Sequence, residues 1–292
     1  MKTTMDVNLY AYGNGAQNFD CEKGSSVLKN AIEKSVFADQ CCFSPPLQVE
    51  HRRQQAAAIP DVIKLSEQLA QSVQHSISNH RLFITLGGDH TAAIGAWSGA
   101  ANAVDTLGLI WFDAHMDSHT FKTSPSKNSH GMPLAILLGH GEKKLTQLIS
   151  AKPKLKPENV VLMGVRSFEK GEADLLKKLG VKIFYSDEIK KLGIKKVIQE
   201  SITIVTRHAN YFGISIDLDG FDPIDAPGVG TPAPDGIRAA DFLPEFTAIA
   251  EHPQLIGADI VEFNPVLDVD CKTEQLAMKL FEALMNIRKN PR

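Results

Sequence analysis

Short apolar runs alternate with helix-like segments along this chain of 292 residues. The apolar runs are rich in Val, Ile, Leu and Phe, whereas the helix-like segments place apolar residues at three- and four-residue steps, as at Val62, Leu65 and Leu69. This alternation is typical of a parallel sheet covered by helices on both faces. It predicts a three-layer α/β/α fold with a mostly parallel sheet. The predicted strands are 7–12, 82–86, 107–112, 160–164, 182–185, 212–216 and 255–263, and the predicted helices are 26–35, 60–77, 92–101, 170–179, 195–206, 239–251 and 273–288.

No linker, internal repeat or low-complexity tract divides the sequence. Length alone allows one large α/β domain or two smaller ones. Three loops break the alternation, at 43–55, 119–131 and 220–237, and all are rich in Pro, Gly, Ser or Thr. In open parallel sheets, ligands bind at the carboxyl ends of the strands, where such loops form the pocket. We therefore expect a single domain over residues 1–292 with one crevice at a sheet end.

The composition favours a small-molecule partner. Apolar residues make up 43% and charged residues 22% of the chain, close to the averages for globular proteins. With 31 basic and 34 acidic residues, the formal net charge is −3, so neither nucleic acid nor a membrane is an expected partner. The N-terminal residues lack the apolar core of a secretory signal, and no apolar run approaches a membrane span. We expect a cytoplasmic protein.

The cysteines show no Cys-x-x-Cys spacing and are expected to be free thiols. They are Cys21, Cys41, Cys42 and Cys271. Metal binding or redox sensing by the adjacent pair Cys41-Cys42 remains an alternative.

Acidic residues and histidines follow three of the predicted strands. His90 comes after the run 82–86; Asp113, His115 and Asp117 come after 107–112; Asp217 and Asp219 come after 212–216. In an extended chain, side chains at i, i+2 and i+4 point to one side, so the members of each cluster can converge. Three parallel strands would deliver all of these side chains at one edge of the sheet.

So many charged side chains would repel each other in a partly buried site, and the simplest compensation is a cation. Four aspartates and two histidines are enough ligands for two divalent ions. A carboxylate-bridged pair roughly 3.5–4 Å apart is a known arrangement for activating water. Alternatively, these residues cap helices or accept turn hydrogen bonds. The repetition of the same ligand chemistry after three strands favours the two-metal site.

In this order, the segments resemble the ureohydrolase family. The motifs are Gly87-Gly88-Asp89-His90, Asp113-Ala114-His115-x-Asp117, Ser215-Ile216-Asp217-Leu218-Asp219-Gly220-x-Asp222-Pro223 and Glu262-x-Asn264-Pro265. The resemblance runs from about residue 82 to 267, and it implies an enzyme with two manganese ions that splits a guanidino compound into urea and an amine. By this resemblance, His90, Asp113, Asp117 and Asp217 hold one ion, and Asp113, His115, Asp217 and Asp219 hold the other. Cobalt, iron and zinc also suit such ligands.

The resemblance also implies catalytic roles. Glu262 would hold the substrate guanidinium, a planar fork that suits a carboxylate; alternatively it is an exposed strand end. His130 would carry protons to or from the departing amine, or else it packs against residues 131–133. Asp117 belongs to the catalytic set as well as to the metal ligands, and Thr231 would line the guanidinium pocket.

The loop 119–131 has the length that the family shows in arginases, whereas agmatinases carry a shorter segment. The resemblance places Ser124 and Ser126 at the substrate α-carboxylate, together with His119, where the family usually has asparagine. Glu169 and Glu172 would hold the α-amino group, and Glu169 stands where arginases usually have aspartate. We therefore expect hydrolysis of L-arginine to L-ornithine and urea.

Other functions remain as alternatives. One is another ureohydrolase, such as an agmatinase, a guanidino-acid hydrolase or a formimidoylglutamase. Another is a metal-binding homologue without activity, which a lost ligand would mark, and none of the six ligands is missing. The resemblance further implies a homo-oligomer, a trimer or hexamer, that acts in arginine metabolism.

Overall fold

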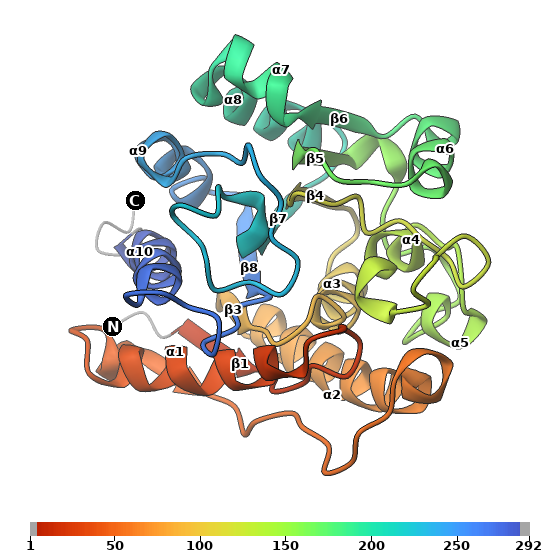
Figure 1. Cartoon of the computed structure of the whole chain (residues 1–292), viewed down its shortest axis with the longest axis horizontal. Coiled ribbons are helices and arrows are strands. Elements are labelled where there is room, and N and C mark those ends of the chain that lie inside the picture. Colours follow the sequence, from red (N-terminus) through yellow and green to blue (C-terminus); the bar gives the residue numbers. More distant parts are fainter. Residues whose placement is uncertain (1–4, 287–292) are drawn as a thin grey trace.

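Eight parallel strands form one sheet in the computed structural model, which describes residues 5–286. The strand order across the sheet is β2-β1-β3-β8-β7-β4-β5-β6. Helices surround the sheet (Figure 1). The strands are β1 (Met5–Leu9), β2 (Cys41–Phe43), β3 (Phe83–Leu86), β4 (Leu107–Phe112), β5 (Val160–Val165), β6 (Lys182–Tyr185), β7 (Tyr211–Asp217) and β8 (Leu255–Val261).

The helices form a layer on each face of the sheet. The α-helices are α1 (Gly24–Glu33), α2 (Ile59–Ser78), α3 (Ala92–Ala103), α4 (Pro133–Leu137), α5 (Lys143–Thr146), α6 (Lys170–Leu179), α7 (Ser186–Leu192), α8 (Ile194–Thr206), α9 (Ala239–Ala250) and α10 (Lys272–Asn286). Short 3-10 helices are η1 (Phe19–Lys23), η2 (Ala38–Gln40), η3 (Gln55–Ala58), η4 (Ser129–Gly131), η5 (Pro157–Asn159) and η6 (Leu218–Gly220).

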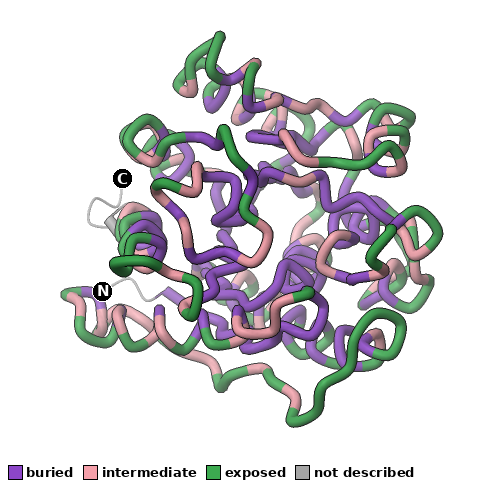
Figure 2. The backbone as a smooth tube through the Cα atoms, viewed as in Figure 1, coloured by how far each residue is buried: buried purple, intermediate pink, exposed green. Residues whose placement is uncertain are grey.

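Side chains that alternate along the strands build two separate cores. On β4, Ile110 and Phe112 belong to the core shared with α1 and α7 to α10, whereas Leu109 and Trp111 belong to the core shared with α2 to α6. Both cores lie inside the molecule, which Figure 2 shows as a buried centre within an exposed periphery. The three-layer α/β/α prediction is therefore confirmed, and the sheet is parallel throughout.

The predicted elements agree with the structure in position more than in extent. β1 ends at Leu9 instead of continuing to residue 12, although Tyr10 still forms a bridge to Leu47. The predicted helix 273–288 extends beyond the described residues at its end. β2, α4, α5 and α7 were not predicted, because each is too short to show a strand or helix period in the sequence.

The strand order brings the candidate residues to one place. The chain passes from β3 to β4 across a gap of two strand positions, which β7 and β8 later fill. The carboxyl ends of β3, β8, β7 and β4 are therefore neighbours, at a reversal of strand order where open sheets bind ligands. Within residues 5–286, no helix has the length and apolar character needed to cross a membrane.

Candidate metal centre

The predicted ligands meet at the carboxyl ends of these four strands. His90 follows β3, the Asp113 cluster follows β4, and Glu262 follows β8, while Asp217 ends β7 and Asp219 lies in η6. Apart from the partly exposed His115, these side chains are buried. Glu262 is only 2% exposed, which contradicts the alternative of an exposed strand end.

The backbone turns at both aspartate clusters, so the extended geometry assumed from the sequence is wrong there. Asp117 has a φ of +45°. The Asp113 Oδ1 atom accepts a hydrogen bond from the amide of His115 at 2.6 Å, and the Asp217 Oδ1 atom accepts one from Asp219 at 2.9 Å. The turn alternative therefore holds for one oxygen of each aspartate. The other oxygen, Oδ2, faces His90 in both cases.

One candidate ligand group is centred on His90. Its Nδ1 atom lies 2.9 Å from an oxygen of Asp117, 3.1 Å from Asp217 and 3.4 Å from Asp113. The ring of Trp111 stacks on the His90 ring with centroids 4.3 Å apart, and the Trp111 indole donates to Asp113 Oδ2 at 2.9 Å. Nitrogen and carboxylate oxygen from four residues thus point to one spot.

A second candidate group is centred on His115. Its Nδ1 atom lies 3.1 Å from Asp219 Oδ2 and 3.5 Å from Asp113 Oδ1. Asp219 is held by the amide of Ala114, at 3.2 Å, and by the hydroxyl of Thr231, at 3.1 Å. Asp113 therefore contributes to both groups, as a bridging ligand does.

Hydrogen bonds behind His90 show which of its nitrogens is free to bind a metal. Ser215 Oγ donates to the buried Asp259 at 2.6 Å, so its oxygen accepts from His90 Nε2 at 3.0 Å. Nε2 then carries the proton, and the Nδ1 lone pair points at the carboxylates. Nδ1 is buried and makes no hydrogen bond within the described chain. This is the arrangement of a metal-ligating imidazole with a hydrogen-bonded partner on its other nitrogen.

The electrostatics of the cluster also favour a cation. Burial, and after it the charge of Asp113, raise the pKa of Asp117 to about 6. Burial together with Asp219 and Asp113 raises the pKa of Asp217 well above its usual range. Burial opposes a charge on His90, but Asp117, Asp113 and Asp217 raise its pKa, so this spot attracts positive charge. Oxygen and imidazole ligands suit divalent manganese, cobalt, iron or zinc.

Glu262 and His130 form a pair beside the His90 group. The Glu262 Oε1 atom accepts from the amide of His90 at 2.9 Å and lies 3.0 Å from His130 Nδ1. Burial opposes a charge on His130, but Glu262 raises its pKa to about 9. The other carboxylate oxygen, Oε2, has no hydrogen-bond partner in residues 5–286 and lies near Gly230. Glu262 can therefore accept a further donor.

The loop after Asp117 and the start of α6 form the outer part of the site. His119 Nε2 lies 2.9 Å from Glu169 and 3.4 Å from Glu172, and its Nδ1 lies 3.1 Å from Thr123 Oγ1. These three acidic and imidazole groups have the spacing of metal ligands. However, Glu172 is already bonded by the amides of Ser118 and Glu169, both at 3.1 Å, so the cluster is satisfied without a metal.

Ser124 and Ser126 lie in the same loop with their hydroxyl oxygens 3.4 Å apart. The Ser124 hydroxyl accepts from the amide of Lys127, at 2.9 Å, and the Ser126 hydroxyl accepts from Asn128, at 3.2 Å. Both oxygens are thereby fixed in place. At least one hydroxyl proton remains free for an anionic group.

Comparison with known proteins identifies the family. The protein-family model described as "Arginase family" matches residues 16–286 of the sequence. The chain belongs to the arginase family. It is 43% identical to the arginase of Bacillus caldovelox over 223 residues, which cover 76% of this chain and 75% of that protein. It is also 43% identical to the arginase of Bacillus subtilis over 224 residues, which cover 77% of this chain and 75% of that protein.

Solved structures agree with the family assignment. The native Bacillus caldovelox arginase superimposes with a TM-score of 0.90 at 35% identity, covering 98% of both chains. An Entamoeba histolytica arginase in complex with L-ornithine gives a TM-score of 0.88 at 27% identity, covering 98% of this chain and all of that one. The formimidoylglutamase of Bacillus subtilis, at 20% identity and a TM-score of 0.81, shares the fold; it covers 99% of this chain and 88% of that chain.

Several supporting residues of this arginase-family site were missed in the sequence. Ser215 and Asp89 lie inside quoted motifs, but their roles emerge only from the structure. Asp89 accepts from the amides of Gly15, at 2.7 Å, and Thr91, at 3.0 Å, and so ties the first loop to the His90 turn. Asp259 had a visible signal, because a charged residue within the buried apolar strand β8 requires a partner.

Proposed function

We propose that this arginase-family protein hydrolyses L-arginine to L-ornithine and urea with two manganese ions. The observation that carries the proposal is the pair of buried ligand groups that share Asp113 at the carboxyl ends of β4 and β7. His90, Asp113, Asp117 and Asp217 would hold one ion, and Asp113, His115, Asp217 and Asp219 the other. Two such ions, when bound, lower the pKa of water and so supply hydroxide at neutral pH.

The chain's own residues would orient the guanidinium. Its carbon is a poor electrophile because resonance spreads the charge, so the group must be held close to the nucleophile. Glu262 would accept the guanidinium N–H groups with Oε2, the oxygen that faces Gly230, while His90 and His130 hold Oε1 in place. Thr231, at the edge of the same pocket, is already fixed by its bond to Asp219.

His130 would move the proton that the leaving amine needs. Its pKa, raised to about 9 by Glu262, keeps the imidazole protonated at neutral pH and able to donate. Cleavage breaks the bond between the guanidinium carbon and the arginine Nε atom. That nitrogen takes up a proton and becomes the δ-amino group of the departing L-ornithine. His130 is a positioned general acid for this step.

The outer loop would recognise the amino-acid end of L-arginine. The Ser124 and Ser126 hydroxyls would donate to the α-carboxylate, with His119 beside them. Glu169 and Glu172 would attract the α-ammonium group, since both lie next to His119 at the start of α6. This recognition requires one oxygen of Glu169 to remain available while the other contacts His119.

A second candidate is a guanidino-acid hydrolase whose substrate lacks the α-amino group. It is favoured by one observation: Glu169 Oε2 already lies 2.9 Å from His119 Nε2. Such a substrate would use the serines but not the glutamates.

The cellular setting is also proposed from the family resemblance. We expect a cytoplasmic homo-oligomer, a trimer or hexamer, that acts in arginine metabolism. Sedimentation of the purified protein measures its oligomeric state directly.

Urea release by metal-stripped protein reloaded with single metals tests the function. The panel contains L-arginine, agmatine and 5-guanidinopentanoate, and formimidoyl-glutamate is assayed by formamide release, because it holds no guanidino group and cannot give urea. The proposed function requires L-arginine with manganese to give the highest kcat/KM. Equal or higher activity on 5-guanidinopentanoate selects the second candidate, and no turnover with any metal leaves a binding protein.

A further inference from the structure

Arg166, which follows β5, makes an unusual set of contacts. Its guanidinium nitrogens contact six backbone carbonyl oxygens at 2.6 to 3.1 Å. These carbonyls belong to Gly164, Asp219, Gly220, Phe221, Ala233 and Pro234. All but Gly164 lie in the segment from η6 to the end of the loop 220–237.

No carboxylate in residues 5–286 forms an ion pair with Arg166. Burial opposes the charge on this partly buried guanidinium, the carboxylates of Asp219 and Asp113 favour it from beyond ion-pair distance, and neutral carbonyls satisfy its donors. The rigid, planar fork of arginine suits several acceptors at once, which a lysine ammonium cannot match. The arrangement therefore indicates that the residue serves to hold this backbone.

The carbonyls come from the two ends of the loop 220–237. Phe221 and Ile237 form a β-bridge where the two ends of the loop meet, which we call the neck of the loop. Arg166 contacts the carbonyl of Phe221 there. The same contacts include the carbonyl of Asp219, a member of the second ligand group. Within the loop, Thr231 donates to Asp219 Oδ2 at 3.1 Å. Arg166 thus contacts Asp219 itself and Ala233, two residues after Thr231.

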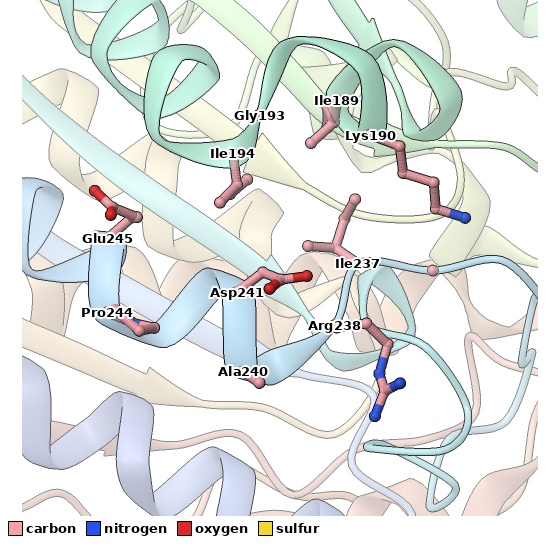
Figure 3. Close-up of a pocket in the computed structure, with 11 residues that line it drawn as sticks. Ile189, Lys190, Gly193, Ile194, Ile237, Arg238, Ala240, Asp241, Pro244 and Glu245 are labelled. Carbon is pink, nitrogen blue, oxygen red and sulfur yellow. The ribbon is translucent and has the colours of Figure 1, made fainter.

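The end of the loop that follows Pro234 has a second anchor. Ser186 and Lys190 of α7 both donate to the carbonyl of Asp235, at 2.6 and 3.0 Å. Beside this anchor, Ile189, Lys190 and Ile237 line a cavity of about 440 Å³ between α7, α8 and α9 (Figure 3). Loss of Arg166 would therefore remove the contacts with the Asp219–Phe221 and Ala233–Pro234 carbonyls but leave the anchor at Asp235.

We propose that Arg166 is a positioning residue that sets the affinity of the ion held by His115 and Asp219, acting through Thr231. This rests on the proposed two-ion centre. A displaced loop neck moves the Thr231 hydroxyl away from Asp219 and leaves that carboxylate free to rotate out of the ligand group. The His90 group has supports of its own, Ser215 and Trp111.

The experiment uses Arg166→Lys, Arg166→Met and Thr231→Val, with Arg207→Met as the matched control. Arg207 is exposed at the end of α8, and its side chain has no hydrogen bond or ion pair among the described residues. Manganese is titrated into metal-stripped protein. Loss of a partner that orients a ligand typically weakens metal binding by about 10–100-fold, so we expect at least about tenfold weaker binding of one ion, with the other changed less than twofold. His115→Asn identifies which ion is affected.

A double variant separates positioning from general damage. Because Arg166 acts through Thr231, Arg166→Lys combined with Thr231→Val should bind the weaker ion no worse than about threefold below either single variant. If the losses of ion affinity in the two single variants multiply in the double variant, the proposal is overturned. Equal weakening of both ions, or unchanged binding in Arg166→Lys, also overturns it.

Amide hydrogen exchange gives a readout that needs no metal. In Arg166→Lys, the amides of Phe221, Asp222 and Ile237 should exchange faster, while those of α7 keep their protection. Unchanged exchange in the loop contradicts the proposal even if the wild-type protein binds fewer than two ions. Binding of fewer than two ions by the wild-type protein would instead count against the proposed function.

Discussion

The metal centre and the outer loop solve the same problem, placing polar groups for a ligand, in different ways. At the centre, each ligand is buried and oriented by fixed groups behind it, as Ser215 and Trp111 orient His90. In the outer loop, Ser124 and Ser126 are oriented by amides of their own loop, and the Glu169 side chain is 59% exposed. The centre is thus built by the sheet, whereas the loop is built locally.

This difference predicts distinct effects of substitution. A change at the centre removes a ligand from a low-dielectric cluster whose charges depend on each other, so metal content and turnover fall together. A change in the outer loop alters contacts with one end of the substrate, so its effect should appear in substrate choice and KM. The following experiments test that division.

The largest effect is expected from Asp113→Ala or Asp217→Ala. Each removes a proposed bridging ligand, so the protein should lose metal and urea release should fall to near background. Elemental analysis and a urea assay measure both. Asp187→Ala, on the exposed surface of α7, is the control and should retain full activity. A bridging variant with two ions per chain and near-full turnover would show that the two-metal assignment is wrong.

A large effect is also expected from removal of the substrate carboxylate. Agmatine leaves the buried Ser124 hydroxyl and the exposed Ser126 hydroxyl without their partner, and polar groups left unmatched once the substrate covers them can lower kcat/KM by about a hundredfold or more. Replacing both serines with alanine should reduce this discrimination, chiefly by weakening the reaction with L-arginine, while metal content stays constant. Similar kcat/KM for the two substrates in the wild-type protein would contradict an arginase.

His130→Asn should separate chemistry from metal binding. The residue contacts Glu262 but lies in neither ligand group. Positioned acid–base groups contribute about 10²–10⁴-fold, so kcat should fall at least about tenfold while both ions remain. The exposed His208→Asn is the control. Unchanged kcat would favour the packing alternative for His130, and lost metal would make it a ligand.

The sequence predicted those parts of the fold whose signal is local. The predicted strand 107–112 has the same bounds as β4, because polar residues on both sides mark where the apolar run begins and ends. β2 was missed because Cys41–Phe43 pairs with β1 only through the sheet and carries no pattern of its own. Strand order, which decides that β3, β8, β7 and β4 lie together, depends on contacts between distant segments.

The ligands themselves were predictable because metal binding restricts the residue types that can serve. Their supports were not, since many side chains can donate or accept a hydrogen bond. Arg166 illustrates this: an arginine before α6 has no distinctive sequence context, and five of its six acceptors are carbonyls more than fifty residues away. The turns at Asp113 and Asp217 were predicted only as an alternative for a related reason, because a side chain that bonds its own backbone leaves no spacing to recognise.

The smallest effect is expected from Glu169→Gln. Its carboxylate is mostly exposed and already shares a hydrogen bond with His119, and exposed ion pairs contribute only about 0–1 kcal/mol. KM for L-arginine should therefore rise by no more than about fivefold, with kcat and metal content unchanged. The same variant should leave KM for 5-guanidinopentanoate unaltered, because that compound has no α-amino group. Glu158→Gln, in η5 and outside the site, is the control. A loss of metal or of kcat in Glu169→Gln would show that the outer loop and the metal centre are coupled, and the division between them would fail.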